Sequence, residues 1–195
     1  LGTVDVVNDR TLDGALQAFE RFLALENASW KGDRGTALLS DPHDAAFVRR
    51  LFQSLAAQGN ASVALLRVNG EAISAQVLMY CGTTAYTWKT AFDAEYAKYS
   101  PGALLIDKIT DELFAGSGIV AINSCAAEAS FMGQLWAGRR PTVDLLIDIG
   151  ARKSVGYRIE AARQLAYQRL RSWRDGFRQW RSTPRPKKLG VASLS

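Results

Sequence analysis

The sequence predicts an α+β (α/β) fold, in which helices flank a mixed, mostly antiparallel sheet and a basic helix follows at the C-terminal end. Three observations support this prediction. Residues 62–90 alternate between apolar and polar side chains with the period of β-strands. Amphipathic segments with helical spacing stand before and after that stretch. From Gly150 onward the chain becomes dense in arginine.

The elements before residue 60 are marked by their capping residues. They are a short strand at 3–7, a helix over 11–26 and a second helix over 42–58. Thr11 is the expected N-cap of the first helix, and Asp41, followed by Pro42, starts the second. The polar loop between the two helices carries Trp30, Lys31 and a glycine.

The strands of 62–90 form a three-strand antiparallel meander. Asn69-Gly70 is the strongest short-range hairpin signal in the chain, and the "CGT" that begins at Cys81 makes a second reversal. After the meander we expect a helix at about 101–115, a strand at 118–123, a short helix at about 128–137 and a strand at 142–149. The predicted order is therefore β-α-α-β-β-β-α-β-α-β, with one domain over 1–150, a basic amphipathic helix over 151–182 and a disordered tail over 183–195.

Composition excludes several classes of protein. The 195 residues are 48% hydrophobic, enough to bury a full core, and no apolar run approaches the roughly 20 residues that cross a bilayer. Cys81 and Cys125 cannot build a disulfide framework, and no cysteine or histidine spacing fits a metal. His43, the only histidine, is expected to be exposed in the first turn of its helix. These features predict a reducing, cytoplasmic setting.

The positive charge is concentrated at the C-terminal end. The residues from Gly150 onward carry twelve Lys or Arg and two acids, for +10, which leaves −5 on the first 149 residues of a chain with a net charge of +5. Ile159, Leu170 and Trp173 lie on one apolar stripe of this arginine-rich helix. The stripe fits packing on the chain's own domain, and the arginines leave nucleic acid or an anionic membrane as alternative partners.

A Ser-Pro-Gly junction stands where the third strand of the meander gives way to a helix. Ser100 is a preferred N-cap, Pro101 suits the first helical turn, and Gly102 allows another group to approach the backbone. A helix start of this kind presents unpaired N–H groups to a phosphate or diphosphate, and Lys98 adds a counter-charge. An ordinary capped helix without a ligand is the other interpretation.

Three blocks of the sequence together resemble GNAT acyltransferases, and within them the CelD/BcsL-type group related to Fem-type peptidyltransferases. The blocks are "FLALENASWKGDRGTAL" (22–38), "YTWKTAFDAEYAKYSPGALL" (86–105) and "INSCAAEASFMGQLW" (122–136). The resemblance covers roughly 10–150. It implies a GNAT-like fold and identifies the chain as the C-terminal domain of a longer protein, with an upstream domain as partner, which also fits a start at Leu1 rather than Met.

The resemblance implies transfer of an acyl group, such as acetyl, from coenzyme A to an amine or hydroxyl of a saccharide or small metabolite, without a metal. The residues expected to bind the coenzyme are Lys89, Thr90, Ala91, Tyr96, Lys98, Tyr99, Ser100, Gly102 and Ala103. Those expected to bind the acceptor are Trp30, Lys31 and Trp88, and the catalytic candidates are Asn123, Cys125 and Glu128. Asp93 and Glu95 are further nearby carboxylates that can serve as a base through water.

Most of these residues also have a purely structural interpretation. Cys125 also fits a small buried thiol, Asn123 a bond to the end of its strand, and Trp88 a core side chain. The loop "YAKYSPG" has one glycine where GNAT proteins have two. The resemblance implies an aspartate where Asn123 stands and a histidine within residues 128–132, which contain none. Fem-type relatives often have a lysine near the position of Met132. A catalytically silent binding or assembly domain and a Fem-type aminoacyl transferase are the alternatives.

Overall fold

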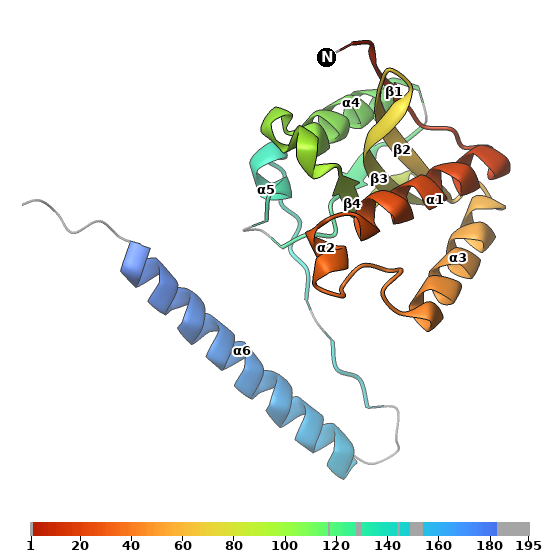
Figure 1. Ribbon diagram of the computed structural model, residues 1–195. Coiled ribbons are helices and arrows are strands. Elements are labelled where there is room, and N and C mark those ends of the chain that lie inside the picture. The colour runs from red at the N-terminus through yellow and green to blue at the C-terminus, as the bar shows by residue number, and fades with distance from the viewer. Residues whose placement is uncertain (1, 117, 128–129, 144, 149–153, 183–195) are drawn as a thin grey trace, which may run out of the picture. The chain divides into compact units, whose positions relative to one another are not determined.

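The computed structural model describes residues 2–116, 118–127, 130–143, 145–148 and 154–182. The chain forms two units, residues 1–139 and 140–195. The first unit contains the sheet and the helices that cover it, and the second contains one long helix (Figure 1). The predicted disordered tail, 183–195, lies outside the described residues.

The sheet of the first unit has five strands in the order β1-β2-β3-β4-β5. The strands are β1 (Val4–Val7), β2 (Ala61–Val68), β3 (Glu71–Cys81), β4 (Thr84–Phe92) and β5 (Ala121–Asn123). Neighbours are antiparallel except β4 and β5, which run parallel. Asn69 (φ 52°) and Gly70 (φ 85°) both have positive φ, as a two-residue hairpin turn with the right-handed twist requires. The predicted meander is confirmed, and the sheet is the expected mixed, mostly antiparallel one.

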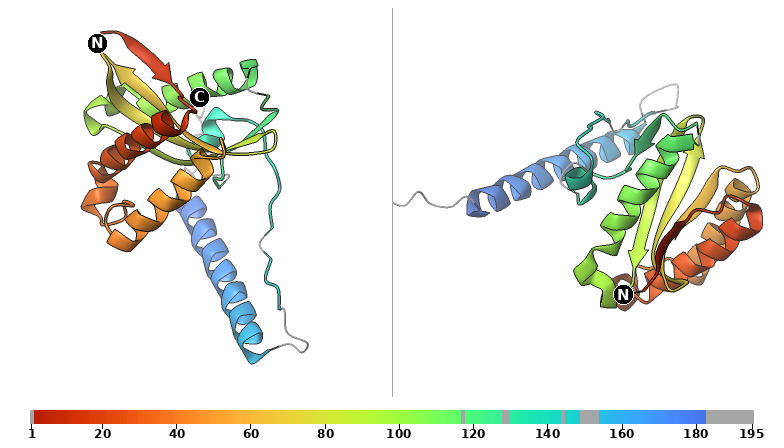
Figure 2. Two further views of the ribbon diagram at one scale, coloured as in Figure 1. Left: turned by 90° about the vertical axis from the view of Figure 1, so that its right-hand side faces the viewer. Right: turned by 90° about the horizontal axis from the view of Figure 1, so that it is seen from above.

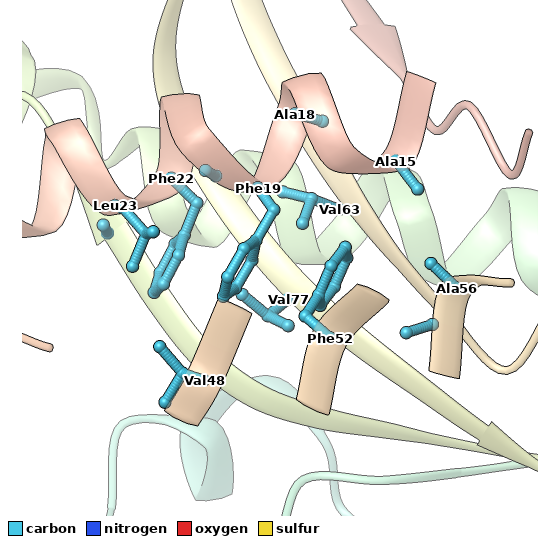
Figure 3. Close-up of a cluster of buried hydrophobic side chains, with 13 residues drawn as sticks. Ala15, Ala18, Phe19, Phe22, Leu23, Val48, Phe52, Ala56, Val63 and Val77 are labelled. Atoms are coloured by element: carbon cyan, nitrogen blue, oxygen red, sulfur yellow. The ribbon is translucent and has the colours of Figure 1, made fainter. Parts of the chain in front are cut away.

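Two helices pack on one face of this sheet. They are α1 (Leu12–Asn27), capped by Thr11, and α3 (Pro42–Ala56), capped by Asp41, as predicted. The rings of Phe19 on α1 and Phe52 on α3 stack nearly parallel with centroids 4.0 Å apart (Figure 3). Both rings are fully buried together with alanine and valine side chains of β2 and β3. This cluster is the larger part of the core and fixes α1 on the sheet.

The opposite face of the sheet is covered by α4 (Pro101–Gly116), as two views of the ribbon show (Figure 2). Leu105, Ile109 and Leu113 of this helix are buried against β2 and β3. Their spacing of four residues places them on one side of the helix. The start of α4 is thereby held beside the C-terminal end of β4, and the packing fixes the junction that the sequence singled out.

Several predicted elements differ from the structure. The loop after α1 contains a short helix, α2 (Trp30–Asp33), and a 3₁₀ helix, η1 (Ala94–Tyr99), precedes α4. In each case a side chain caps a backbone N–H two residues ahead: Ser29 accepts from Lys31 N and Asp93 from Glu95 N. Turns of four to six residues have too little periodicity to be recognised in a sequence.

The elements after α4 are shorter than predicted. β5 begins at Ala121 rather than at residue 118, and α5 (Met132–Leu135) occupies only four residues of the predicted 128–137, of which 128–129 lie outside the described residues. The strand predicted at 142–149 is wrong over its described residues, which form no strand. Val143 and Ile147 are more than 70% exposed there, and an apolar segment without a ladder partner does not become a strand.

The second unit contains α6 (Val155–Ser182), a helix of 28 residues over the segment where a basic amphipathic helix was expected. Its large aliphatic side chains with described positions, including Ile159 and Leu170, are exposed, and so is Trp173. Over the described ranges of the chain, no helix combines the length and apolarity needed to cross a membrane.

Candidate functional site

On its outer edge, β4 is paired with a described strand only over its first residues. Thr84–Tyr86 pair with Ala121–Asn123 of β5, but beyond Tyr86 no described strand pairs with β4 on that side. On the other side, β3 places one residue, Val77, opposite two residues of β4, Trp88 and Lys89. This is a β-bulge, which bends a strand and leaves a backbone group outside the regular ladder. The C-terminal half of β4 therefore has an open edge beginning at its bulge.

The pairing of β5 with β4 ends at Asn123, and a turn follows. Thr87 Oγ1 still donates to the Ser124 carbonyl at 3.2 Å, but Cys125 then has a positive φ of 52°. Asn123 Oδ1 accepts from Cys125 N at 2.9 Å and stabilises this turn. The predicted catalytic Asn123 thus satisfies a backbone group at the strand end, which was one of its two interpretations.

The start of α4 contains unpaired amide groups next to the C-terminal end of β4. The N–H groups of Gly102 and Ala103 donate to no residue that the structure describes, whereas Leu104 N donates to the Ser100 carbonyl at 3.1 Å. The first turn contains no acidic side chain, so the positive end of the helix dipole is not compensated. Two unpaired amides at a helix start are the arrangement that binds phosphate groups.

Two residues of the Ser-Pro-Gly junction differ from expectation in detail. Ser100 has a left-handed backbone (φ 51°, ψ 52°) instead of the extended conformation usual for an N-cap. Gly102 is buried, and a Cβ on it would lie 3.6 Å from Thr90 Cγ2 and 3.8 Å from Phe92 Cδ1, which is ordinary contact. Packing against β4 therefore does not require glycine at this position.

The residues just before the junction take different positions. Tyr96 is half-buried and packs against the core on the α4 side of the sheet. Tyr99 is exposed, and Lys98 Nζ lies 4.9 Å from its ring centroid in a cation–π contact. Of the three predicted coenzyme-binding residues here, Lys98 and Tyr99 are accessible to a ligand.

A buried carboxylate on the opposite face joins three elements. Glu26, near the end of α1, is fully buried, and its Oε1 accepts from Lys89 Nζ of β4 at 2.8 Å and from Lys31 Nζ of α2 at 3.3 Å. Its Oε2 accepts from Leu38 N at 3.0 Å, and Lys31 Nζ also donates to the Thr90 carbonyl at 3.2 Å. Lys31 and Lys89, predicted to contact acceptor and coenzyme respectively, are thus brought together at the bulge.

Burial alone would raise the pKa of Glu26. The hydrogen bonds from Lys89 and Leu38 and the charges of both lysines outweigh it and lower the pKa below its usual value. Glu26 is therefore an ionised anchor rather than a proton acceptor. Sequence reasoning missed it, although one signal was present: Glu26 continues the apolar spacing of Phe19, Phe22 and Leu23 along the buried face of α1.

The other β4 residues predicted to bind coenzyme bond to β3. Thr90 Oγ1 donates to Oε1 of the buried Gln76, and the Ala91 carbonyl accepts from Ser74 Oγ at 3.1 Å. These bonds lie on the part of β4 that pairs with no described strand on its outer side. They hold the open edge to β3 after the bulge interrupts the ladder.

The tryptophans predicted to bind the acceptor have different surroundings. Trp30, on α2, is 56% exposed, and the Arg34 guanidinium lies 5.0 Å from its ring centroid. Trp88 is half-buried and packs against the α1–α3 core, in line with its core interpretation. Trp30 is the one of the two that presents an aromatic face to solvent.

The catalytic candidates after β5 gain little support from their surroundings. Cys125 is exposed, so the expected buried thiol is wrong, and local desolvation raises the pKa of its thiol. A thiol with a raised pKa is a poorer nucleophile at neutral pH. Glu128 lies outside the described residues. Asp93 and Glu95 lie at the start of η1, where Asp93 Oδ1 accepts from Glu95 N at 2.9 Å.

Among the residues with described positions, no group of three or more His, Cys, Asp or Glu side chains could hold a metal ion.

Comparison with known proteins bears on the first unit. A family model described as an acetyltransferase (GNAT) domain matches residues 1–128. A search among curated proteins found no match.

Several solved structures are similar in fold. An aminoglycoside acetyltransferase, meta-AAC0020, from an uncultured soil metagenomic sample, in complex with sisomicin, has a TM-score of 0.53 at 14% identity, covering 75% of this chain and 97% of that one. A possible acetyltransferase from Clostridium difficile 630 has a TM-score of 0.54 at 11% identity, covering 76% and 99%. At these identities the likeness establishes the fold alone.

Proposed function

This chain belongs to the GNAT acetyltransferase domain family, and we propose on that basis that it transfers an acetyl group from acetyl-coenzyme A to an amine or hydroxyl of a saccharide or small metabolite. One observation carries the proposal for this particular chain. The unpaired amides of Gly102 and Ala103 lie at the end of the same β4 segment that is bulged and open along its outer edge. A coenzyme needs both features, a diphosphate site and an accessible strip of backbone leading from it.

The residues present fit such a coenzyme. The amides of Gly102 and Ala103 would hold the diphosphate at the positive end of α4, with Lys98 and Tyr99 accessible beside them. The bound coenzyme would supply an activated thioester. A backbone N–H in the stretch from Lys89 to Ala91 would polarise the thioester carbonyl, as a donor fixed where negative charge develops.

Acetyl transfer then needs no side-chain nucleophile. The nitrogen or oxygen of the acceptor attacks the thioester carbon, the C–S bond breaks, and coenzyme A leaves with the sulfur. The acceptor's proton passes to water or to a carboxylate acting through water, for which Asp93 and Glu95 are the candidates with described positions. Glu26 is excluded from this task because it is fully buried and its pKa is lowered.

The acceptor side of the proposal rests on α2. The Glu26 carboxylate fixes Lys31 and Lys89, which holds α2 against the bulged part of β4. This contact places the exposed ring of Trp30 on an element anchored at the proposed reaction centre. An exposed indole offers a stacking surface for the apolar face of a sugar ring, so a saccharide acceptor is the class that we favour.

Three finer assignments belong to the same proposal. The motif resemblance supports placing the chain in the CelD/BcsL-type group, and with it an upstream domain in a longer protein. A cytoplasmic location is supported by the free, exposed cysteines Cys81 and Cys125, which suit a reducing compartment.

The diphosphate site is tested by introducing one negative charge at the first turn of α4 and, as a control, at its last turn. Ala103→Asp places a carboxylate in the first turn, where it should stabilise the helix through the dipole yet repel a diphosphate. We expect the Kd for coenzyme A, measured by calorimetry, to rise about tenfold or more, equivalent to about 1.4 kcal/mol. Ala115→Asp, the same substitution at an exposed site in the last turn, is the control and should change Kd less than about twofold.

Pantetheine, which lacks the diphosphate, separates the site from a general loss of binding. Its affinity should be equal in both variants. Equal coenzyme A affinity in Ala103→Asp and wild type would refute the docking site. Coenzyme binding without transfer to any amine or hydroxyl acceptor would instead favour a catalytically silent domain.

A further inference from the structure

One face of α6 carries a row of exposed apolar side chains. Val155, Ile159, Leu170 and Trp173 are between 64% and 84% exposed. With about 100° of rotation per residue, these four and the alanines at 162 and 166 fall within a sector of about 80°. We call this set the α6 stripe; it consists of Val155, Ile159, Ala162, Ala166, Leu170 and Trp173.

Arginines line both borders of the α6 stripe. Arg158 and Arg169 follow one border, and Arg163 and Arg174 follow the other. Arg163 makes an ion pair with Glu160 at 3.0 Å, in which the arginine side chain is 76% exposed. Residues 155–174 contain five arginines and one acid, a net charge of +4. The helix thus combines an apolar stripe with a positive charge on either side of it.

The spacing of these residues argues for a flat partner. Ile159 and Leu170 are eleven residues apart, and so are Arg158 and Arg169. Eleven residues fill three turns at 3.67 residues per turn, close to the 3.6 of a straight helix, so the stripe runs almost parallel to the helix axis. A heptad seam through Ile159 would instead contain Arg163 or Arg169, which disfavours a left-handed coiled coil with a second copy.

We propose that the α6 stripe binds the surface of an anionic lipid bilayer, with the helix lying in the interface. The apolar side chains would enter the boundary between headgroups and acyl chains, and the arginines on both borders would reach the lipid phosphates. Trp173, the most exposed of the four large side chains at 84%, is of the type enriched at that boundary. No described helix is suited to crossing the bilayer, so α6 would lie on it rather than span it.

Lipid explains the stripe better than nucleic acid does. Arginines alone suffice for a phosphate backbone, whose binding gains nothing from a continuous row of aliphatic side chains. The proposal is independent of acetyl transfer, because it concerns only the second unit of the chain. It would give the enzyme a location at a membrane surface.

The test uses the full chain and two kinds of vesicle, phosphatidylcholine alone and phosphatidylcholine mixed with phosphatidylglycerol. We expect co-sedimentation at least about tenfold stronger with the mixed vesicles, and weaker at high salt. Leu170→Glu should lower partitioning onto the mixed vesicles about tenfold. Gln168→Glu is the matched control: it introduces the same residue and the same charge on the opposite face, at another exposed site, and should change partitioning less than about threefold.

The tryptophan emission provides a second readout. Vesicles should shift the emission to shorter wavelength in the wild type, and the shift should be smaller in Trp173→Phe. Because Leu170 is exposed, its substitution should leave the circular dichroism of the protein unchanged.

Several outcomes would overturn the proposal. Absence of partitioning onto the mixed vesicles would do so, as would equal losses in Leu170→Glu and Gln168→Glu. Retention of single-stranded RNA without vesicle binding, unaffected by Leu170→Glu, would assign the arginines to nucleic acid. A dimer in sedimentation that Leu170→Glu dissociates, without vesicle binding, would assign the stripe to a second copy of this chain.

Discussion

Replacing Glu26 with glutamine removes one negative charge from a fully buried position and leaves the size of the side chain unchanged. The glutamine oxygen can still accept from Leu38 N, but its NH₂ group then faces the ammonium groups of Lys31 and Lys89. Removing one partner of a buried ion pair costs about 3–5 kcal/mol. Both lysines are about a quarter exposed and can turn toward water, so we expect a loss of about 2 kcal/mol in the free energy of unfolding.

Glu20→Gln is the matched control on the same helix. Glu20 accepts two bonds from Arg49, at 2.7 and 2.9 Å, but both side chains are about half exposed. An exposed pair contributes about 0.2–1 kcal/mol. Urea unfolding of the full chain should therefore show a midpoint lower by about 1 M for Glu26→Gln, with an unchanged slope, and a shift of at most about half that for Glu20→Gln.

The pH dependence gives the same prediction a second readout. The pKa of Glu26 in the folded state lies below its ordinary value of 4.5, so its ionised form stabilises the fold. That contribution is complete above pH 4.5 and is lost as the pH falls through the lowered pKa. The difference in stability between wild type and Glu26→Gln should therefore be constant near neutrality and shrink below pH 4.5. Equal costs for the two variants, or a difference that does not shrink in acid, would refute the assignment of Glu26 as a charged anchor.

Three further outcomes are expected. Phe52→Ala should lower the free energy of unfolding by about 3–5 kcal/mol, because the ring is buried against Phe19. Phe47→Ala, at a 63% exposed ring on the same helix, should lower it by less than about 0.5 kcal/mol. Equal thermal stability of the two variants would contradict the packing. Trp30→Ala should raise the KM for a saccharide acceptor about tenfold, measured by release of the coenzyme thiol, without changing thermal stability. An unchanged KM would remove Trp30 from the acceptor site. Cys125→Ser should keep acetyl transfer within about twofold, because the raised pKa of the thiol disfavours a nucleophile; a loss of 100-fold or more would restore Cys125 as a catalytic residue.

The features that sequence predicted correctly are those decided by neighbouring residues. The hairpin turn needs two residues that tolerate positive φ, and Asn69-Gly70 provides them. The caps of α1 and α3 need an acceptor oxygen within three residues of the N–H groups that it binds, and Thr11 and Asp41 provide it. The covering of the sheet follows from the apolar faces of those helices. In each case the sequence contains the whole interaction.

The features that it missed depend on distant partners. Lys89 and Glu26 are 63 residues apart in the chain, and only the packing of α1 on the sheet brings their charged groups to 2.8 Å. A charged residue on a buried helix face signals such a pair but does not identify its partner. The strand predicted at 142–149 failed for the same reason: an apolar segment becomes a strand only where a partner is available, and its described apolar side chains are instead exposed.

At Asn123 and residues 128–132 the sequence differs from the group that it resembles, and these differences concern side chains. The features that support the proposed site are largely features of the backbone. The bulge opposite Val77 and the end of β4–β5 pairing after Tyr86 define the open edge without help from residues 128–132. Asn123 lies at the end of that pairing, and its side chain stabilises the turn at Cys125 that follows. An aspartate, which the resemblance implies at this position, would accept the same bond from Cys125 N, so asparagine retains the turn and lacks only the negative charge. For this reason we expect coenzyme binding to tolerate these substitutions, and any loss to fall on the proton-transfer step, where a carboxylate would have acted.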